Sequence, residues 1–307
     1  MSAELLQSVL VTIVTAATPL LIAAIGELLA ERAGVLNLGV EGMMIIGASV
    51  AFAAAYPSDS TLLGSLAGCL AGMALAALFS LLTIGLAANQ VASGLATTAL
   101  GVGLSGLVGA GFVGLKREGA PPLHIPGLSD LPLVGKLVFG EDLFVYAAVA
   151  LVIAVSFFLN RTRAGLTLRA VGDNHGSAHA LGIPVRRIRL MAVLFGGACA
   201  GLAGSYLSLA YPGFWSPGMT AGRGWIALAL VVFASWRPWR AVAGALLFGG
   251  ATILQLQAQA LGISIPAQFM SSIPYLATIV ALVLLSIGRA RGAAAPAALG
   301  LPFVPDR

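Results

Sequence analysis

Apolar runs long enough to cross a lipid bilayer follow one another along almost the whole chain. A helix that crosses the hydrocarbon core needs about 20 apolar residues, and its backbone polar groups must all bond within the protein. The runs predict nine membrane spans, at residues 6–29, 38–56, 62–88, 91–114, 143–159, 190–211, 225–236, 242–261 and 273–287. The expected fold is an all-α, polytopic integral membrane protein. Because the seventh run is short, 222–225 and 133–139 are candidates for re-entrant half-helices.

The composition excludes several classes of protein. Hydrophobic residues make up 59% of the 307 and charged residues 9%, with a mean hydropathy of +1.00, whereas a soluble domain needs a far more polar surface. The basic residues lie at segment ends without an aromatic-studded face, which argues against nucleic-acid binding. The two cysteines lie in separate apolar runs, and the three histidines lack further ligands, so we predict no disulfide, metal or cofactor site.

The longest polar interruption, residues 160–189, sets the orientation of the chain. It carries six arginines and one acid, Asp173, and loops rich in Lys and Arg stay on the cytoplasmic side. Alternation of the nine spans then places twelve basic residues inside (Arg32, Arg161, Arg163, Arg169, Arg186, Arg187, Arg189, Arg237, Arg240, Arg289, Arg291, Arg307) and four outside (Lys116, Arg117, Lys136, Arg223). This asymmetry predicts an external N-terminus and a cytoplasmic C-terminus.

Local signals within this loop predict a short helix. Asp173 or Asn174 can cap a helix that runs through Leu181, after which Gly182 supplies a stop and Pro184 prevents continuation. We expect about two helical turns in the cytosol.

One face of this helix is expected to be apolar. Ala178 and Leu181 are three residues apart and share a face, with Ile183 just beyond. An exposed apolar face of this kind is suited to bind in a groove on a partner protein. The alternative is a solvated loop whose arginines only set the orientation.

Polar residues interrupt the apolar pattern between the first two spans. Ionisable groups at membrane depth face a cavity, a partner or a pathway, so Glu27, Glu31, Arg32, Asn37 and Glu41 mark an irregular hinge near a solute pathway. The alternative is structural: Glu27 or Glu31 pairs with Arg32 and holds adjacent helices together.

Neutral polar groups recur in later spans. Gln255 and Gln259 are four apart on one face, where two amides either join helices or present hydrogen bonds to a hydroxyl-rich solute. The candidate pathway residues are Asn37, Glu41, Thr97, Thr98, Gln255 and Gln259. They suit an uncharged polar solute better than an anion.

Three strings carry a family resemblance. ERAGVLNLGVEGMM, RAVGDNHGSAHALGIPV and GRGWIALALVVFASWRPWRAVAGALLFG resemble the permease subunits of ATP-binding-cassette importers for simple sugars, nucleosides and branched-chain amino acids. The first string and PGLSDLPLVGKLVF look most like the nucleoside branch. The chain departs from the branch where Asn-Pro and two alanines are usual, at residues 174–178. The resemblance implies that the loop helix couples the permease to an ATPase subunit. The expected contact residues are Asn174, Ala178, Leu181, Gly182 and Ile183.

The resemblance implies a bacterial inner-membrane protein that moves a nucleoside or related sugar-bearing solute inward by alternating access. Its expected partners are two ATPase subunits, a second permease and an external solute-binding protein. The chain has no GxxxxGK[ST] loop, so ATP hydrolysis is expected on another chain and this subunit is not an enzyme. Alternatives are a permease for a simple sugar or a branched-chain amino acid, and an ion-coupled carrier, which would want acids in several spans. A membrane enzyme would need a catalytic cluster that the sequence lacks.

The chain divides into a permease domain, 1–291, and a tail, 292–307. The Ala- and Pro-rich tail has no periodicity and is expected to be disordered. The outer stretch 115–142 is either a platform for a delivering protein or a passive loop. Gly-x-x-x-Gly spacings at 68–72 and 197–201 indicate close helix packing.

Overall fold

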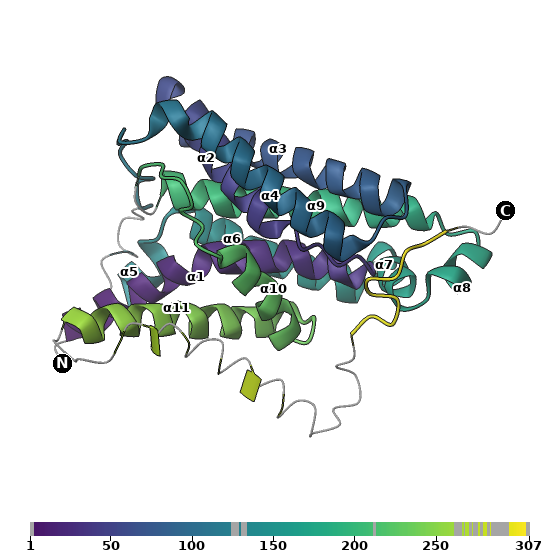
Figure 1. The fold of residues 1–307 in the computed structure, drawn as a ribbon. Coiled ribbons are helices and arrows are strands. Elements are labelled where there is room, and N and C mark those ends of the chain that lie inside the picture. The colour runs from purple at the N-terminus through teal and green to yellow at the C-terminus, as the bar shows by residue number, and fades with distance from the viewer. Residues whose placement is uncertain are drawn as a thin grey trace.

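The computed structural model describes residues 3–123, 129, 134–210, 213–260, 266, 268–269, 272, 276, 279–280, 283 and 295–304. Within these ranges the chain forms α-helices joined by turns (Figure 1). The helices are α1 (Ala3–Arg32), α2 (Val40–Ser58), α3 (Thr61–Ser80), α4 (Gln90–Gly109), α5 (Val134–Phe139), α6 (Leu143–Arg161), α7 (Arg163–Asp173), α8 (His175–Ala180), α9 (Val185–Leu209), α10 (Arg223–Phe233) and α11 (Pro238–Ala260). A π-helical turn, η1 (Leu81–Gly85), extends α3, and a 3-10 turn, η2 (Ala110–Phe112), extends α4.

The predicted spans correspond to these helices, with one change in number. Each of the first eight coincides with a helix, but within the described ranges six helices are long and apolar enough to cross a membrane: α1, α2, α3 with η1, α4 with η2, α6 and α9. α10 has 11 residues and is too short to span, in agreement with the weakness of the seventh apolar run. Most of the ninth predicted span, 273–287, lies outside the described residues. An all-helical membrane protein is therefore confirmed, and a count of nine spans is not.

Helix α9 forms the centre of the bundle and packs against α1, α2 and α3. It crosses α3 at the two Gly-x-x-x-Gly segments, whose spacing predicted close packing but not which helices meet. A Cβ at Gly197 would lie 2.7 Å from the Gly72 carbonyl oxygen, and one at Gly72 would lie 2.8 Å from the Gly201 amide nitrogen. Because these glycines have no side chain, the two helix backbones can touch, and van der Waals contact between the backbones holds the helices together.

The connections gather at two opposite ends of the bundle, as the predicted alternation requires. At one end Gln90 Oε1 accepts from Leu36 N (2.7 Å), and Ala298 N donates to Gly172 O (2.9 Å). At the other end Arg117 N donates to Gly213 O (2.8 Å), while its side chain lies 3.5 Å from Asp59. The start of α1 belongs to this second end, far from residues 295–304 (Figure 1).

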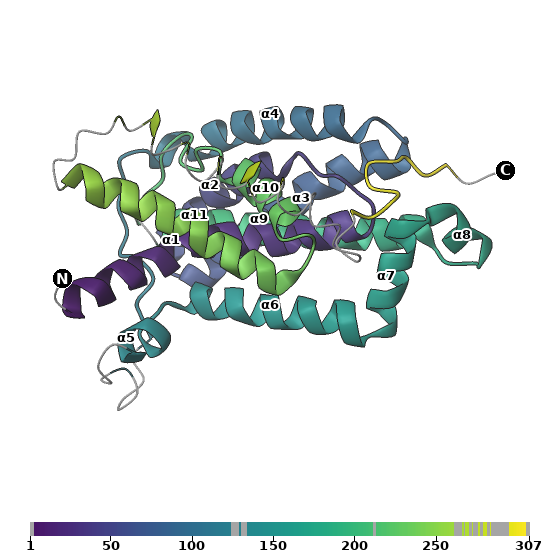
Figure 2. The ribbon, with the colours of Figure 1, turned by 90° about the horizontal axis from the view of Figure 1, so that it is seen from below.

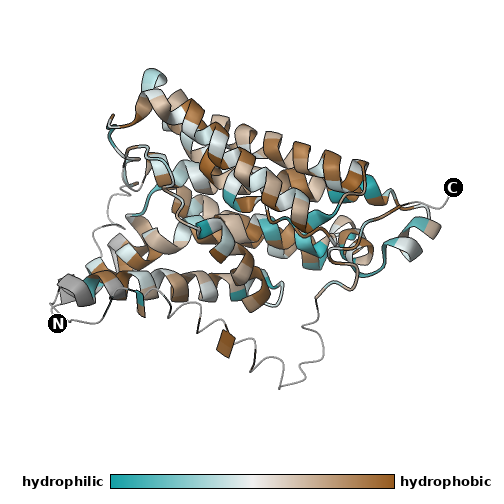
Figure 3. Cartoon of the chain, viewed as in Figure 1, coloured by the Kyte–Doolittle hydropathy of each residue, from teal (hydrophilic) through white to brown (hydrophobic). Residues whose placement is uncertain are grey.

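The outer faces of the bundle are apolar along its length (Figure 3). Large exposed side chains lie on α3, α4 and α6, among them Leu62, Leu70, Leu107, Ile153 and Phe157. An exposed apolar surface of this extent would be unfavourable in water but suits contact with lipid tails.

Two acidic residues, the buried Glu141 and the half-buried Asp142, stand at the start of α6. Asp142 Oδ1 accepts from Phe144 N (2.9 Å) and Val145 N (3.1 Å) and so caps the helix. Burial raises the pKa of Asp142, and these bonds partly offset the rise. Burial, with the neighbouring Asp142 charge, raises the pKa of Glu141 to about 7.

Candidate functional site

The link between α1 and α2 is the irregular segment that the polar residues predicted. Residues 33–39 leave the helical path through Gly34, whose φ is +86°, a conformation that favours glycine. Glu27 Oε1 accepts from Asn37 N (3.1 Å), and Asn37 Oδ1 accepts from Gly39 N (3.0 Å). Both side chains are almost completely buried. Their side-chain oxygens accept hydrogen bonds from this backbone, because water is not available to do so at membrane depth.

Glu31 and Arg32 both bind Trp236, which lies in the turn between α10 and α11. Trp236 Nε1 donates to Glu31 Oε2 (2.5 Å), and Arg32 Nε and Nη2 donate to the Trp236 carbonyl oxygen (3.3 and 3.1 Å). Ser235 and Trp236 have φ of +51° and +55°, a strained conformation that the surrounding bonds must hold. The prediction that Glu27 or Glu31 pairs with Arg32 is wrong in its partners, because within the described ranges each binds elsewhere. The structural role itself is present.

Glu41 binds the start of the short helix α10. Its Oε1 accepts from Thr220 Oγ1 (2.6 Å) and Gly222 N (3.0 Å), and its Oε2 accepts from Gly224 N (2.6 Å). A carboxylate is favourable there because the first amides of a helix lack partners and carry partial positive charge. α10 lies in the middle of the bundle (Figure 1), so this carboxylate makes a broken helix tolerable within the membrane.

The structure brings four of the six candidate pathway residues into one region. Thr98 Oγ1 donates to Leu38 O (3.0 Å) across the α2–α4 contact, while Thr97 Oγ1 donates to Ser93 O (2.8 Å) within α4. With Asn37 and Glu41, these groups are occupied by bonds inside the protein. Gln255 and Gln259 belong to α11, which packs on α1, α6 and α10, and their side chains lie outside the described set.

The predicted loop helix is present as α8, at the far end of the molecule beyond α7 (Figure 2). Asn174 Oδ1 accepts from Ser177 N (2.9 Å) and caps it. Gly182 follows with φ of +77°, and Pro184 precedes α9. The local signals therefore placed this helix correctly to within a residue.

The apolar face of α8 differs from the prediction. Ala178 is 3% exposed and packs with Val171, Val185 and Phe303, whereas Leu181 is 80% exposed. Because Leu181 follows the last helical residue, it does not continue the Ala178 face. Leu181 and the half-buried Ile183 remain accessible, and Ala178 is not.

Phe303 belongs to a C-terminal segment, 295–304, that packs against this end of the bundle. Its ring contacts those of His175 and His179 edge-on, each with a centroid distance of 5.3 Å. Arg189 Nη1 donates to Leu301 O (2.9 Å), and Gly300 N donates to Gly34 O (3.3 Å). The composition of the tail predicted disorder, but this segment is held by contacts with the α1–α2 link, α7, α8 and α9.

The same contacts define the state of His175. Arg189 Nη2 lies 3.1 Å from His175 Nδ1, and a guanidinium only donates, so Nδ1 is the acceptor. Burial and the Arg189 charge lower the pKa of His175. The imidazole is therefore neutral at pH 7.

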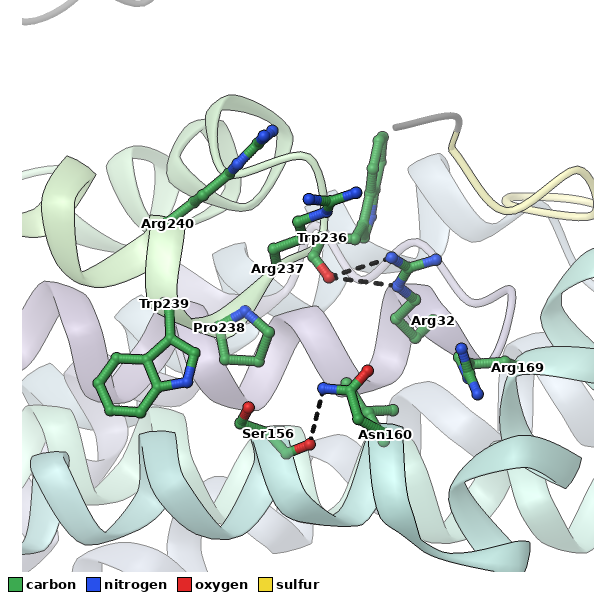
Figure 4. Close-up of a pocket in the computed structure, with 10 residues that line it drawn as sticks. Arg32, Ser156, Asn160, Arg169, Trp236, Arg237, Pro238, Trp239 and Arg240 are labelled. Carbon is green, nitrogen blue, oxygen red and sulfur yellow. Dashed lines mark hydrogen bonds between the residues drawn. The ribbon is translucent and has the colours of Figure 1, made fainter. Parts of the chain in front are cut away.

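A cavity of about 490 Å³ opens at the same end, between α1, α6, α7 and the start of α11 (Figure 4). Its lining contains four arginines and no acid: Arg32, Ser156, Leu159, Asn160, Arg169, Trp236, Arg237, Pro238, Trp239 and Arg240.

A helical bundle with apolar outer sides, polar broken backbone in its middle and basic connections at one end defines a multi-pass membrane protein. Sequence comparison gives the family. The model for the permease component of branched-chain amino acid transport systems matches residues 9–287, and the chain belongs to this family.

Three relatives cover most of the chain. It is 45% identical over 291 residues to a putative glucose ABC transporter permease protein of Haloferax volcanii, covering 88% of each chain. It is 35% identical to a guanosine ABC transporter permease protein of Bacillus subtilis, covering 94% of this chain and 93% of the relative. It is also 35% identical to a nucleoside ABC transporter permease protein of Lactococcus lactis, covering 98% of each.

The protein is accordingly the membrane-spanning permease subunit of an ABC transporter, and it is not itself an enzyme. Membership of this family implies an ATPase and a solute-binding protein as partners.

Sequence reasoning missed three features of this region. It did not pair Glu41 with α10, although Gly222 and Gly224 marked a helix start. It did not attach the tail to α8, and only the apolar run around Phe303 hinted at a packed segment. It interpreted the arginines as orientation signals and did not predict that four of them line one cavity.

Proposed function

We propose that this chain imports a nucleoside, or a closely related sugar-bearing solute, by alternating access driven by two ATPase subunits. It works beside a second permease in the cell membrane, the inner one where there are two. The N-terminus is outside and the end with α7 and α8 is cytoplasmic.

The state of the buried acids carries the argument for a neutral solute. Glu31 and Glu41 are occupied by donors of the turn after α10 and of the start of α10, and Glu27 holds the α1–α2 link. Glu31 and Glu41 thus bind side chains and amides of the protein itself, and Glu27 keeps one oxygen, Oε2, without a partner among the described residues. The three therefore offer no free pair of carboxylates to a solute. Because Asn37, Thr97 and Thr98 are also occupied within the protein, we assign recognition to the two amides of α11, Gln255 and Gln259, which suit the hydroxyls and base of a nucleoside.

The relatives support the same class of solute. Two that align over nearly their whole length are named for guanosine or nucleosides, and the relative with 45% identity is named as a putative glucose permease. A nucleoside contains a sugar, so both names agree with a sugar-bearing solute. A simple sugar is the second candidate on the strength of that relative, ahead of a branched-chain amino acid.

Uptake by cells tests the choice of solute. A strain that lacks this chain is complemented with it and given labelled guanosine, adenosine, glucose, ribose or leucine in parallel. We expect guanosine or adenosine uptake to be restored and to be competed by unlabelled nucleoside but not by glucose. Restoration of glucose or leucine uptake without nucleoside uptake would contradict the proposal.

Two exposed residues test the orientation. Ser177 lies in α8, and Glu118 follows Arg117, whose amide binds Gly213 O at the opposite end of the bundle. On a background without Cys69 and Cys199, an impermeant thiol reagent applied outside intact cells should label a cysteine at 118 and not one at 177. The opposite pattern would invert the topology.

The exposed part of α8 is proposed to couple the permease to the ATPase. Asn174 and Gly182 define the ends of this helix, and Ala178 packs it against Val171, Val185 and Phe303. Leu181 and Ile183 present apolar surface at the tip of the molecule, where an apolar side chain without a partner is unfavourable in water.

A further inference from the structure

The basic cavity at the cytoplasmic end has no part in the proposed solute pathway or in the α8 contact. Its arginines come from separate elements: Arg32 ends α1, Arg169 belongs to α7, and Arg237 and Arg240 flank the start of α11. Arg32 is close enough to Arg169 and Arg237 to be affected by their charges. Like charges gathered from distant parts of the chain destabilise the fold unless an anion offsets them.

Counter-charge inside the protein is sparse. Within the described ranges, none of the four arginines has a carboxylate within ion-pair distance. Asp173 lies near enough to Arg32 to interact with it but is exposed and does not line the cavity. The Arg169 Nε–H is buried without a hydrogen-bond partner, although a buried donor without a partner is costly.

The position of the cavity indicates the source of the anion. Asn160 is next to the last residue of α6, where that helix leaves the bilayer. Trp239 lies across the cavity from Arg169 (Figure 4) and is 58% exposed. Exposed tryptophan beside arginine is typical of the level of lipid headgroups.

An apolar track leads from the cavity into the membrane. Val149, Ile153 and Phe157 are 49%, 52% and 62% exposed, and their spacing places them on the α6 face that reaches Ser156 and Asn160. An acyl chain can follow this face while its headgroup enters the cavity.

We propose that this cavity binds the phosphate headgroup of an anionic phospholipid of the cytoplasmic leaflet. The guanidiniums of Arg169 and Arg237, which both act on the charge of Arg32 between them, supply donors to the phosphate oxygens, while Trp239 and the exposed face of α6 contact the glycerol and acyl parts. Arginine suits this role because its planar fork binds phosphate oxygens in pairs. Basic pockets between membrane helices on this side bind such headgroups in general.

The test uses the purified full chain in neutral detergent and fluorescent phosphatidylglycerol, with phosphatidylcholine as the neutral comparison. Arg169→Gln and Arg237→Gln are compared with Arg163→Gln and Arg186→Gln, which remove the same charge from exposed positions outside the cavity. We expect each cavity variant to weaken phosphatidylglycerol binding roughly fivefold and each control variant to change it less than twofold. Arg169→Lys, which keeps the charge, should bind better than Arg169→Gln.

Further arms separate the other sources of an anion. Equal binding of phosphatidylcholine, or equal loss in the control variants, would overturn the proposal. Displacement of the lipid by millimolar inorganic phosphate would instead identify a site for a free anion. Displacement by the ATPase subunit would identify the cavity as a protein contact. Elution volume and thermal unfolding, measured for every variant, ensure that the comparison is between folded proteins.

Discussion

Two short helices, α10 and α8, solve the same problem in different surroundings. Each starts with amides that have no partner within the helix. α10 lies in the middle of the bundle and takes its acceptors from Glu41, a side chain on α2. α8 lies at the tip of the molecule and takes its acceptor from Asn174, the residue just before it. A helix start inside a membrane protein depends on a distant acceptor, because water is absent, whereas a helix start in water needs only a local cap.

The largest effect is expected when Glu41 is removed. Glu41→Ala leaves Thr220 Oγ, Gly222 N and Gly224 N without an acceptor, and each buried group costs about 1–3 kcal/mol. The sum, about 3 kcal/mol or more, is a large part of the stability of an ordinary domain. We expect little folded protein, measured by fluorescence-detected gel filtration. Glu41→Gln keeps an acceptor oxygen and should lose roughly half as much, so equal behaviour of Ala, Gln and wild-type chains would refute this role.

The next effect concerns transport without a loss of folding. Leu181→Arg places a charge on the exposed tip proposed to enter the ATPase, where an unpaired buried charge costs several kcal/mol. Solute-stimulated ATP hydrolysis in the reconstituted transporter should fall at least tenfold, with thermal unfolding unchanged. Leu123→Arg, on an exposed leucine at the opposite end, is the matched control and should retain activity. Full activity of Leu181→Arg would mean that α8 is not the contact.

A smaller effect is expected at the local cap. Asn174→Ala removes one acceptor from an exposed helix start, a change that costs about 1 kcal/mol. Amide hydrogen exchange at residues 175–180 should accelerate about fivefold, while exchange within α9 stays unchanged. Global unfolding of Asn174→Ala on the scale of Glu41→Ala would erase the contrast between the two helices.

The smallest effect is a dependence on pH at the α8 end. Since burial and Arg189 lower the pKa of His175, the neutral form is favoured in the fold. The contribution of this contact is complete above the ordinary value of 6.5 and is lost as pH falls below it. The protection factors of residues 298–304, which correct for the slower intrinsic exchange at low pH, should therefore fall from pH 7.5 to pH 5.5. His175→Gln, which can accept from Arg189 without titrating, should remove the dependence, and an unchanged pH response in that variant would point to another group.

Much of this architecture could be predicted from local pattern. Apolar runs located the helices, and Gly-x-x-x-Gly spacing indicated close helix packing without indicating which helices meet. Asn174, Gly182 and Pro184 defined α8, because caps and stops act between neighbours in sequence. The polar stretch from Glu27 to Glu41 was correctly taken as an irregular link, since ionisable residues at that depth have few other uses.

The parts that escaped prediction depend on contacts between distant residues. Glu41 and Thr220 are 179 positions apart, and Arg189 and Leu301 are 112 apart. No periodicity within either segment encodes such a pairing. The tail gave a misleading signal for the same reason: Ala, Pro and Gly form no helix pattern, yet a turn at 297–300 and one phenylalanine suffice when a neighbouring surface receives them.

The docked segment 295–304 also has a consequence for biosynthesis. Its residues leave the ribosome after every helix that the structure describes, yet they bind Gly34 from the first helical link and Arg189 from α9. The end of the bundle that carries α7 and α8 therefore reaches its final form only when synthesis has passed residue 303. A chain cut short before Ala298 would lack the Phe303 ring that packs on His175, His179 and Ala178, so α8 would lose part of its support.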